Sequence, residues 1–181
     1  MTEMNINKEL SVLVIPNTVY LNKTDITLKI SKKAGSEFYK RVAKDDFYGI
    51  ALAVREGSTE GLYCEDDFYS VGTLIKIENA KAMRDFYQIK MEIVERVEIE
   101  KLIPEGSNFR ATYKLIPDII DLEPENEKDI IKHIKYLVSE ISENFKGSKT
   151  YVEQVNKLDD ITEIIAYIFP YMRISLEEKQ A

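Results

Sequence analysis

The chain has 181 residues, of which 44% are hydrophobic and 31% charged, which is an ordinary composition for a globular protein with a buried core. Its formal net charge of -7 argues against nucleic acid as the main partner, because phosphate binding rests on a basic surface. A single cysteine, Cys64, excludes an internal disulfide and predicts a cytoplasmic location, and no apolar run reaches the roughly 20 residues that span a bilayer.

Over the first 120 residues apolar and polar side chains mostly alternate, which predicts β-strands. The expected strands are SVLVI (11–15), TVYL (18–21), DITLKI (25–30), FYGIALAV (47–54), VGTLIKI (71–77), YQIKMEIVERVEIE (87–100) and FRATYKLI (109–116). One helix is expected over residues 36–44. Short strands with one helix favour an α+β fold with a small mixed or antiparallel β-barrel.

The longest expected strand shows the clearest alternation. Its apolar residues of one parity are expected on a single face: Tyr87, Ile89, Met91, Ile93, Val97 and Ile99. Val94 and Glu95 interrupt this pattern, which predicts a β-bulge or a sheet edge at that point.

Beyond residue 120 apolar residues recur every three or four positions, which is typical of helices. The first expected helix begins near Pro124 and ends near Gly147, with an apolar stripe of Ile130, Ile131, Ile134, Leu137, Val138, Ile141 and Phe145. Two more are expected over residues 150–158 and 159–169, the second capped by Asp159 or Asp160 and stopped by Pro170. We therefore expect two domains, residues 1–120 and residues 121–181.

Near the end of the chain, Ser175 and Glu178 have the S-x-x-E spacing of a capping box, which opens a helix. Only three residues follow Glu178. Two interpretations are open at this point: the chain is cut from a longer protein as a helix begins, or the tail is frayed and the spacing is a coincidence.

Residues able to carry chemistry are few. With one histidine and one cysteine, a nucleophile and base pair would need His133, which is expected on a helix surface, or Cys64, which is expected as a half-buried strand residue. The pairs of adjacent aspartates lie at element boundaries, where capping is the ordinary role. The stretch KGSKT lacks the glycine spacing of a phosphate loop. The sequence thus predicts no catalytic residue, no metal site and no cofactor.

Several stretches together resemble a known family. DDFYSVGTLIKI (66–77) is similar to its acidic and aromatic lead into Val-Gly-Thr, and MEIVERVEIEKL (91–102) to its strand of the form E-G-x-x-R-V-x-I. YGIALAVREG and LDDITEIIAYIFPYMRISLEEKQ match further segments. The chain, from about Leu13 to Gln180, resembles the amino-terminal, substrate-recognising domain of the ATP-dependent Lon protease. It departs from the family at Ile93, where Gly is usual, and keeps only Pro16 of the prolines in the first strands.

This resemblance implies a PUA-like β-barrel followed by a C-terminal helical bundle, and favours truncation over a frayed tail. In the family this region precedes an ATPase module and a Ser-Lys protease module in a hexamer, and helps to select unfolded or damaged proteins. We therefore expect a non-enzymatic domain for substrate recognition and assembly, with those protein segments and modules as partners and no membrane. Exposed aromatics are expected to form the contact surface, since tyrosine is a frequent recognition residue; the candidates are Tyr63, Phe68, Tyr69, Phe109 and Tyr113.

Two alternatives are open. One is a stand-alone PUA-like domain with another ligand such as RNA, against which the net charge speaks. The other is a small enzyme of unknown chemistry, which the missing nucleophile and base pairs disfavour.

Overall fold

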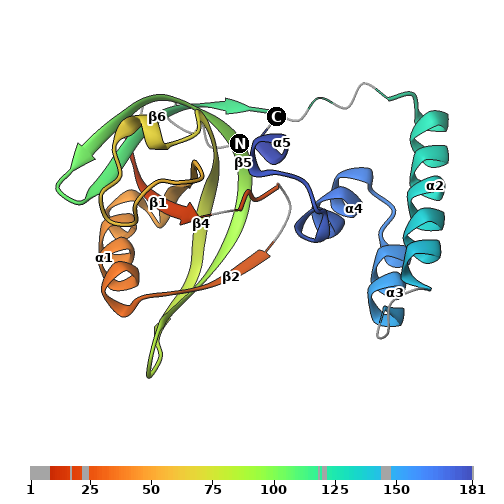
Figure 1. The fold of residues 1–181 in the computed structure, drawn as a ribbon, viewed down its shortest axis with the longest axis horizontal. Helices are drawn as coiled ribbons and strands as arrows, with labels where there is room; N and C mark the ends of the chain where they lie inside the picture. Colours follow the sequence, from red (N-terminus) through yellow and green to blue (C-terminus); the bar gives the residue numbers. More distant parts are fainter. Residues whose placement is uncertain are drawn as a thin grey trace. The chain divides into compact units, whose positions relative to one another are not determined.

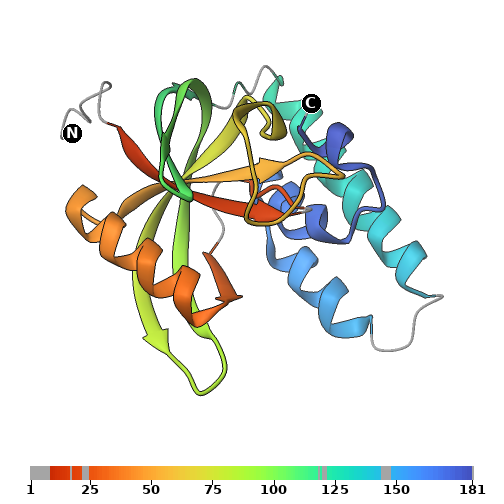
Figure 2. The ribbon, with the colours of Figure 1, turned by 60° about the vertical axis from the view of Figure 1, so that its left-hand side comes forward.

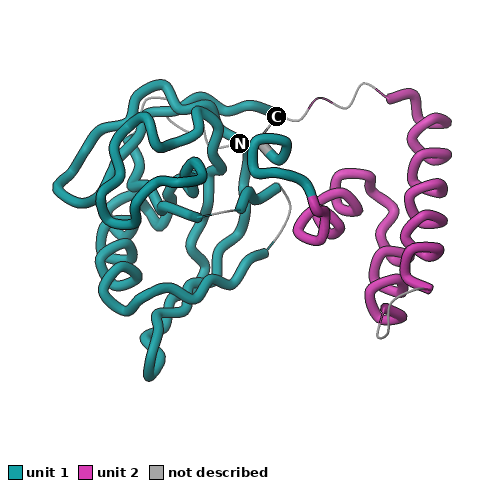
Figure 3. The backbone as a smooth tube through the Cα atoms, viewed as in Figure 1, with its two compact units in different colours: residues 1–117, 174–181 teal, residues 118–173 magenta. Residues whose placement is uncertain are grey.

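The computed structural model describes residues 9–16, 18–21, 25–117, 119, 122–143 and 148–180. Its contacts divide the chain into two compact units (Figure 3). Unit 1 contains residues 1–117 and 174–181, and unit 2 contains residues 118–173. The sequence placed residues 174–181 with the helical part, whereas their contacts group them with the sheet.

Unit 1 is built on a six-stranded mixed sheet (Figure 1). Its strands are β1 (Leu10–Pro16), β2 (Asp25–Ile30), β3 (Tyr48–Val54), β4 (Val71–Ala82), β5 (Tyr87–Glu105) and β6 (Asn108–Ile116). The strand order is β2-β5-β4-β3-β1-β6, and β5 also pairs with β6, so the ladder of strand pairs returns to β5. β1 and β3 are parallel and the other pairs antiparallel.

Both faces of the sheet are buried at β1 and β3, where alternation along the strand divides the residues between two clusters. In β1, Leu10 and Val12 belong to one cluster, whereas Leu13 and Ile15 belong to the other. We call the cluster of Leu13 and Ile15 the first cluster and that of Leu10 and Val12 the second cluster. Two buried faces explain why β3 is apolar at nearly every position.

Helix α1 (Lys32–Val42) packs against the sheet and adds Phe38 and Val42 to the first cluster (Figure 2). It begins four residues before the predicted start, at the N-cap Ser31, whose Oγ accepts a hydrogen bond from Ala34 N at 3.3 Å. Gly35 in the first turn concealed this start, because glycine disfavours helices. A side chain at Gly35 would collide with Tyr87, so the close packing of α1 on β5 requires glycine there.

The predicted β-bulge in the long strand is confirmed at Val94. Ile75 pairs with Ile93 and Leu74 pairs with Glu95, which leaves Val94 as the extra residue. The bulge also corrects a prediction: Ile93 lies in the first cluster and Val97 in the second, so they do not share a face. Equal parity assigns one face only in an uninterrupted ladder.

Residues 18–21 are not a strand, contrary to the prediction from their β-branched and aromatic residues. Val19 and Tyr20 instead pack half-buried against the first cluster. β4 and β5 are both longer than expected and form a hairpin whose turn lies between Ala82 and Tyr87. β-Branched and aromatic residues occur both in paired strands and in segments that pack against a sheet face, so the local sequence of residues 18–21 did not distinguish the two.

Unit 2 contains α2 (Pro124–Ser142), α3 (Lys149–Lys157), α4 (Ile161–Ile168) and the short helix η3 (Phe169–Tyr171). The predicted start at Pro124 is confirmed, whereas Phe145 and Gly147 lie outside the described residues. Asp160 caps α4 by accepting hydrogen bonds from the backbone N–H groups of Thr162 and Glu163, at 2.8 and 3.1 Å. None of the described helices is both long and apolar enough to cross a membrane.

The apolar stripe of α2 is less buried than its periodicity suggests. No residue of α2 is fully buried, and Ile130, Leu137 and Ile141 are exposed. The core of unit 2 instead comes from α3 and α4, through Val155 and Ile164. Periodicity identified the helix correctly, but it does not show whether a neighbour covers the apolar face.

The last segment forms the short helix α5 (Leu176–Gln180), and the predicted capping box is present. Ser175 Oγ accepts a hydrogen bond from Glu178 N at 3.2 Å, and the Glu178 carboxylate accepts one from Ser175 N at 2.8 Å. Leu176 is buried in the first cluster, so α5 packs onto the sheet of unit 1.

Candidate functional site

The five aromatic candidates lie in unit 1, and most of them are packed inside it. Four are between 5% and 8% exposed: Phe68, Tyr69, Phe109 and Tyr113. Tyr63 is half-buried and is therefore the candidate with the most accessible ring. Substrate binding by these five residues stays a prediction. The burial of Phe68, Tyr69, Phe109 and Tyr113 also gives these four a role in packing.

Three aromatic rings of the second cluster pack edge to face. The centroids of Tyr63 and Phe68 are 5.8 Å apart, and those of Phe68 and Phe109 are 4.9 Å apart. Tilted and edge-to-face ring pairs stabilise a core beyond the apolar area that they bury. This contact series joins the half-buried Tyr63 to the interior of the second cluster.

The acidic segment before β4 is a turn, as the sequence predicted. Residues Glu65–Asp67 form the short helix η2, and Asp67 accepts hydrogen bonds from Cys64 N at 2.7 Å and from Ser58 Oγ at 2.9 Å. The backbone bond from Cys64 is the main reason why the pKa of Asp67 is lowered. Cys64 itself is exposed and precedes this turn, so the prediction of a half-buried strand residue is wrong.

A cavity of about 200 Å³ opens between this segment and β5. Its apolar lining comes from both elements and from β3: Leu52, Phe68, Tyr69, Ile99 and Leu102. Its polar lining consists of Arg55, Glu65, Ser70, Glu100 and Lys101. Apolar side chains combined with a few polar groups are the usual lining of a binding site.

Tyr69, which lines this cavity, has two different side-chain partners. The guanidinium carbon of Arg55 lies 4.6 Å from the centroid of the Tyr69 ring. The Tyr69 hydroxyl donates a hydrogen bond to Glu177 of α5 at 3.2 Å. Burial, and then the bond to Glu177, raises the pKa of Tyr69, so the hydroxyl stays protonated and can donate at neutral pH.

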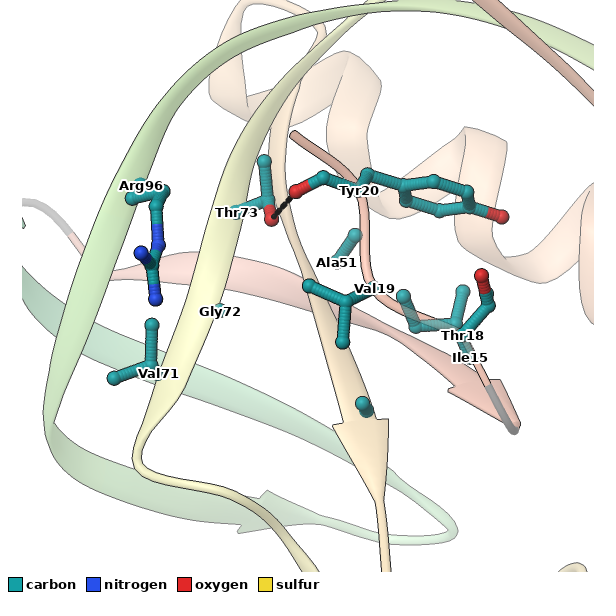
Figure 4. Close-up of a pocket in the computed structure, with 10 residues that line it drawn as sticks. Ile15, Thr18, Val19, Tyr20, Ala51, Val71, Gly72, Thr73 and Arg96 are labelled. Atoms are coloured by element: carbon teal, nitrogen blue, oxygen red, sulfur yellow. Dashed lines mark hydrogen bonds between the residues drawn. The ribbon is translucent and has the colours of Figure 1, made fainter. Parts of the chain in front are cut away.

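A second hollow of about 10 Å³ lies between residues 18–20 and the strands β3 and β4 (Figure 4). Thr73 Oγ1 donates a hydrogen bond to the backbone oxygen of Tyr20 at 3.2 Å and holds the two segments together (Figure 4). Burial raises the pKa of Tyr20 to about 12. This hollow is about the size of one water molecule, so the larger cavity beside Tyr69 is the better candidate for a ligand.

A buried ion pair was missed by the sequence analysis. Asp45 was expected to cap or turn the chain, but it is buried and accepts two hydrogen bonds from Arg110 of β6, at 3.1 and 3.2 Å. Arg110 and Asp45 also bond the buried Ser11 of β1. These residues are far apart in the sequence, so no local pattern indicated the contact.

The two residues considered for nucleophilic chemistry lie in different units. His133 is exposed on α2 of unit 2, as predicted for a surface histidine, whereas Cys64 belongs to unit 1. Within the described ranges, no group of three His, Cys, Asp or Glu side chains is placed to hold a metal ion. The cavity beside Tyr69 is therefore the candidate functional site.

Comparison with known proteins agrees with this picture. The family model of the ATP-dependent protease La (LON) substrate-binding domain matches residues 9–181. The chain belongs to this family. It is 30% identical over 168 residues to the Lon protease of Clostridium beijerinckii, and 31% identical over 131 residues to that of Methanosarcina barkeri.

These alignments cover 93% and 72% of the chain, but only 21% and 16% of the two Lon proteases. The chain thus spans about a fifth of the length of such relatives. Its match is to the substrate-binding domain, and not to the ATPase and protease regions of Lon.

Solved structures show the same fold. The N-terminal domain of a Mycobacterium avium complex Lon protease superposes with a TM-score of 0.70 at 15% identity, covering 96% of this chain and 88% of that domain. A Lon N-terminal domain protein from Xanthomonas campestris gives a TM-score of 0.54 at 12% identity, covering 91% and 99%. At these identities the likeness concerns the fold alone.

Proposed function

We propose that this chain is the non-catalytic recognition domain of a Lon-like ATP-dependent protease, and that it binds unfolded or damaged protein segments and supports assembly with ATPase and protease modules. The match of the substrate-binding family model over residues 9–181 carries the proposal. Several domains held in one assembly would bind one unfolded chain more tightly than a single domain does.

The cavity beside Tyr69 is the proposed contact site. Its volume of about 200 Å³ is below the roughly 300 Å³ at which sites for whole small molecules begin, so it suits one apolar side chain of an extended segment. Phe68 and Tyr69 contribute to its apolar lining, and Arg55 and Lys101 to its polar lining. Of the predicted candidates, Tyr63 is proposed as an outer contact, because its half-exposed ring packs on Phe68.

We further propose that β1, β3, β4, β5 and β6 form a small PUA-like barrel and that unit 2 is the helical bundle of the family. The pairing of β5 with both β4 and β6 supports closure of the strands. A cytoplasmic location, without membrane or nucleic-acid binding, is proposed from the single free Cys64 and the net charge of -7.

Blocking the cavity tests this proposal. Ser70 is exposed and lines the cavity, so Ser70→Trp places a large ring at its mouth without changing the core. Ser107, exposed in the turn between β5 and β6, does not line the cavity and gives the matched control Ser107→Trp. The probe is reduced and carboxymethylated lactalbumin, an unfolded protein.

We expect Ser70→Trp to weaken binding of this probe at least tenfold, about 1.4 kcal/mol, and Ser107→Trp to leave it unchanged. Equal affinities for both variants and the parent would place binding elsewhere. Failure of the parent chain to bind the unfolded protein would contradict the proposed function itself.

A further inference from the structure

Tyr69 takes part in both the cavity and the docking of the last segment of the chain. Its ring lines the cavity, where Arg55 lies over it. Its hydroxyl donates to Glu177, which is 108 positions away in the sequence but belongs to the same compact unit. Glu177 does not line the cavity. A single side chain therefore joins the proposed substrate contact to α5.

The order of α5 depends on contacts with unit 1. A helix of five residues is not stable alone, because its few backbone hydrogen bonds do not offset the conformational entropy lost in nucleating the first turn. The capping box of Ser175 and Glu178 is internal to the segment. What fixes it on the sheet is Leu176, which is 6% exposed within the first cluster, together with the bond between Tyr69 and Glu177.

We propose that docking of residues 174–180 on unit 1 and occupancy of the cavity are coupled through Tyr69, so that each strengthens the other. The coupling rests on the proposed function of the cavity. With α5 docked, Glu177 fixes the Tyr69 hydroxyl and holds the ring in place as a wall of the cavity. With α5 undocked, the ring keeps its packing in the first cluster but loses this acceptor, and a bound side chain must supply the rest of its ordering, which costs conformational entropy.

The coupling is reciprocal. If docking of α5 raises the affinity of the cavity for its ligand by a certain factor, the bound ligand raises the docking equilibrium constant of α5 by the same factor. An apolar side chain in the cavity, packed on the Tyr69 ring, would thus make α5 more ordered. The segment after unit 2 would in this way report on whether the cavity of unit 1 is filled.

Two variants remove the link from opposite ends. Tyr69→Phe deletes the hydroxyl and keeps the ring, and Glu177→Ala deletes the acceptor at an exposed position where misfolding is not expected. Tyr136→Phe is the matched control, because the Tyr136 hydroxyl also bonds a glutamate, Glu140, but on α2 of unit 2. The affinity of each variant for reduced and carboxymethylated lactalbumin is measured by titration calorimetry.

We expect both single variants to bind about fivefold more weakly, the factor that corresponds to one ordinary hydrogen bond, and the control to match the parent. The double variant Tyr69→Phe/Glu177→Ala should be no weaker than either single one, because both changes remove the same interaction. Hydrogen exchange of residues 176–179 in the parent should slow by a similar factor when the unfolded protein is added.

Unchanged affinity in Glu177→Ala, or unchanged exchange of α5 on binding, would overturn the coupling while the proposed function stands. A parent chain that does not bind the probe would overturn both, and the two failures are distinguished by that first titration.

Discussion

At Gly72, the space next to the backbone is already filled. A Cβ atom there would lie 2.9 Å from the backbone oxygen of Ala51 and 2.9 Å from Leu52 Cδ1. The isolated glycine in this strand therefore marks a close backbone approach to β3, a usual reason for glycine inside a strand. The bulge lies at Val94 of the partner strand instead.

Gly72→Val is expected to lower the free energy of unfolding by about 3 kcal/mol, since overpacking forces strand backbones apart. Urea unfolding followed by circular dichroism measures the change. Lys81→Val, at an exposed position of the same strand, should stay within about 0.5 kcal/mol of the parent. A Gly72→Val variant as stable as the parent would show that β3 and β4 can separate without cost.

Replacing Arg41 of α1 and replacing Arg110 of β6 should have opposite effects on stability. Arg41 Nε and Nη1 are buried without a hydrogen-bond partner among the described residues, and burial lowers the pKa of this guanidinium. Its carbon lies 5.9 Å from the Phe38 ring centroid, a packing role that methionine can also fill. Arg110, by contrast, neutralises the buried Asp45.

We expect Arg41→Met to leave stability unchanged or to raise it by about 1 kcal/mol, because an unpaired buried donor is removed. Arg110→Met should cost about 3 kcal/mol, because it leaves the Asp45 carboxylate buried without its partner. Thermal unfolding of the two variants compares them directly. A loss of stability in Arg41→Met as large as in Arg110→Met would mean that the Arg41 charge is needed.

Among the elements, β5 contributes to both clusters, and its register determines which of its side chains enter the first cluster and which the second. Deletion of Val94 removes the extra residue and leaves every other pair with β4 on its present face. Deletion of Glu92, which pairs with Lys76 in a regular part of the ladder, would instead move one side of the strand to the opposite face.

The Val94 deletion should therefore fold cooperatively with a loss of about 2 kcal/mol, the value of one half-buried apolar side chain. The Glu92 deletion should lose cooperative unfolding. Calorimetric unfolding of both chains distinguishes the outcomes, and equal stability of the two would contradict the assignment of the bulge.

The turn η2 is expected to respond to pH through Asp67. The folded pKa of Asp67 lies below its unfolded value, so its stabilising contribution is complete above the unfolded pKa and is lost as the pH falls through the folded pKa, below about 4. The amide proton of Cys64, which donates to Asp67, should shift in NMR spectra over this range. Asp67→Asn should abolish the transition, and a Cys64 signal that does not move down to pH 2 would contradict it.

At the scale of the whole molecule, the sequence predicted features that depend on neighbouring residues. Alternation located six of the seven expected strands, and the caps at Asp160 and Ser175 followed from short spacings. The parallel pairing of β1 with β3 and the ion pair of Asp45 with Arg110 join distant segments, so local patterns could not show them.

The candidate site was predicted only in part, for the same reason. The sequence singled out Phe68 and Tyr69, which line the cavity, but not Arg55 or the segment from Ile99 to Leu102. Those residues reach the site through the pairing of β3, β4 and β5, which sets the position of their side chains. Which aromatics are buried also follows from the two clusters and not from residue type.

The central claim is that unfolded protein binds at this cavity. An NMR titration of the labelled chain with reduced and carboxymethylated lactalbumin tests it most directly, because it locates the contact residue by residue. We expect the largest amide shifts on residues 65–70 and 99–102, with smaller ones in 176–179. Binding whose shifts lie elsewhere, for instance only on the exposed apolar face of α2, would contradict it.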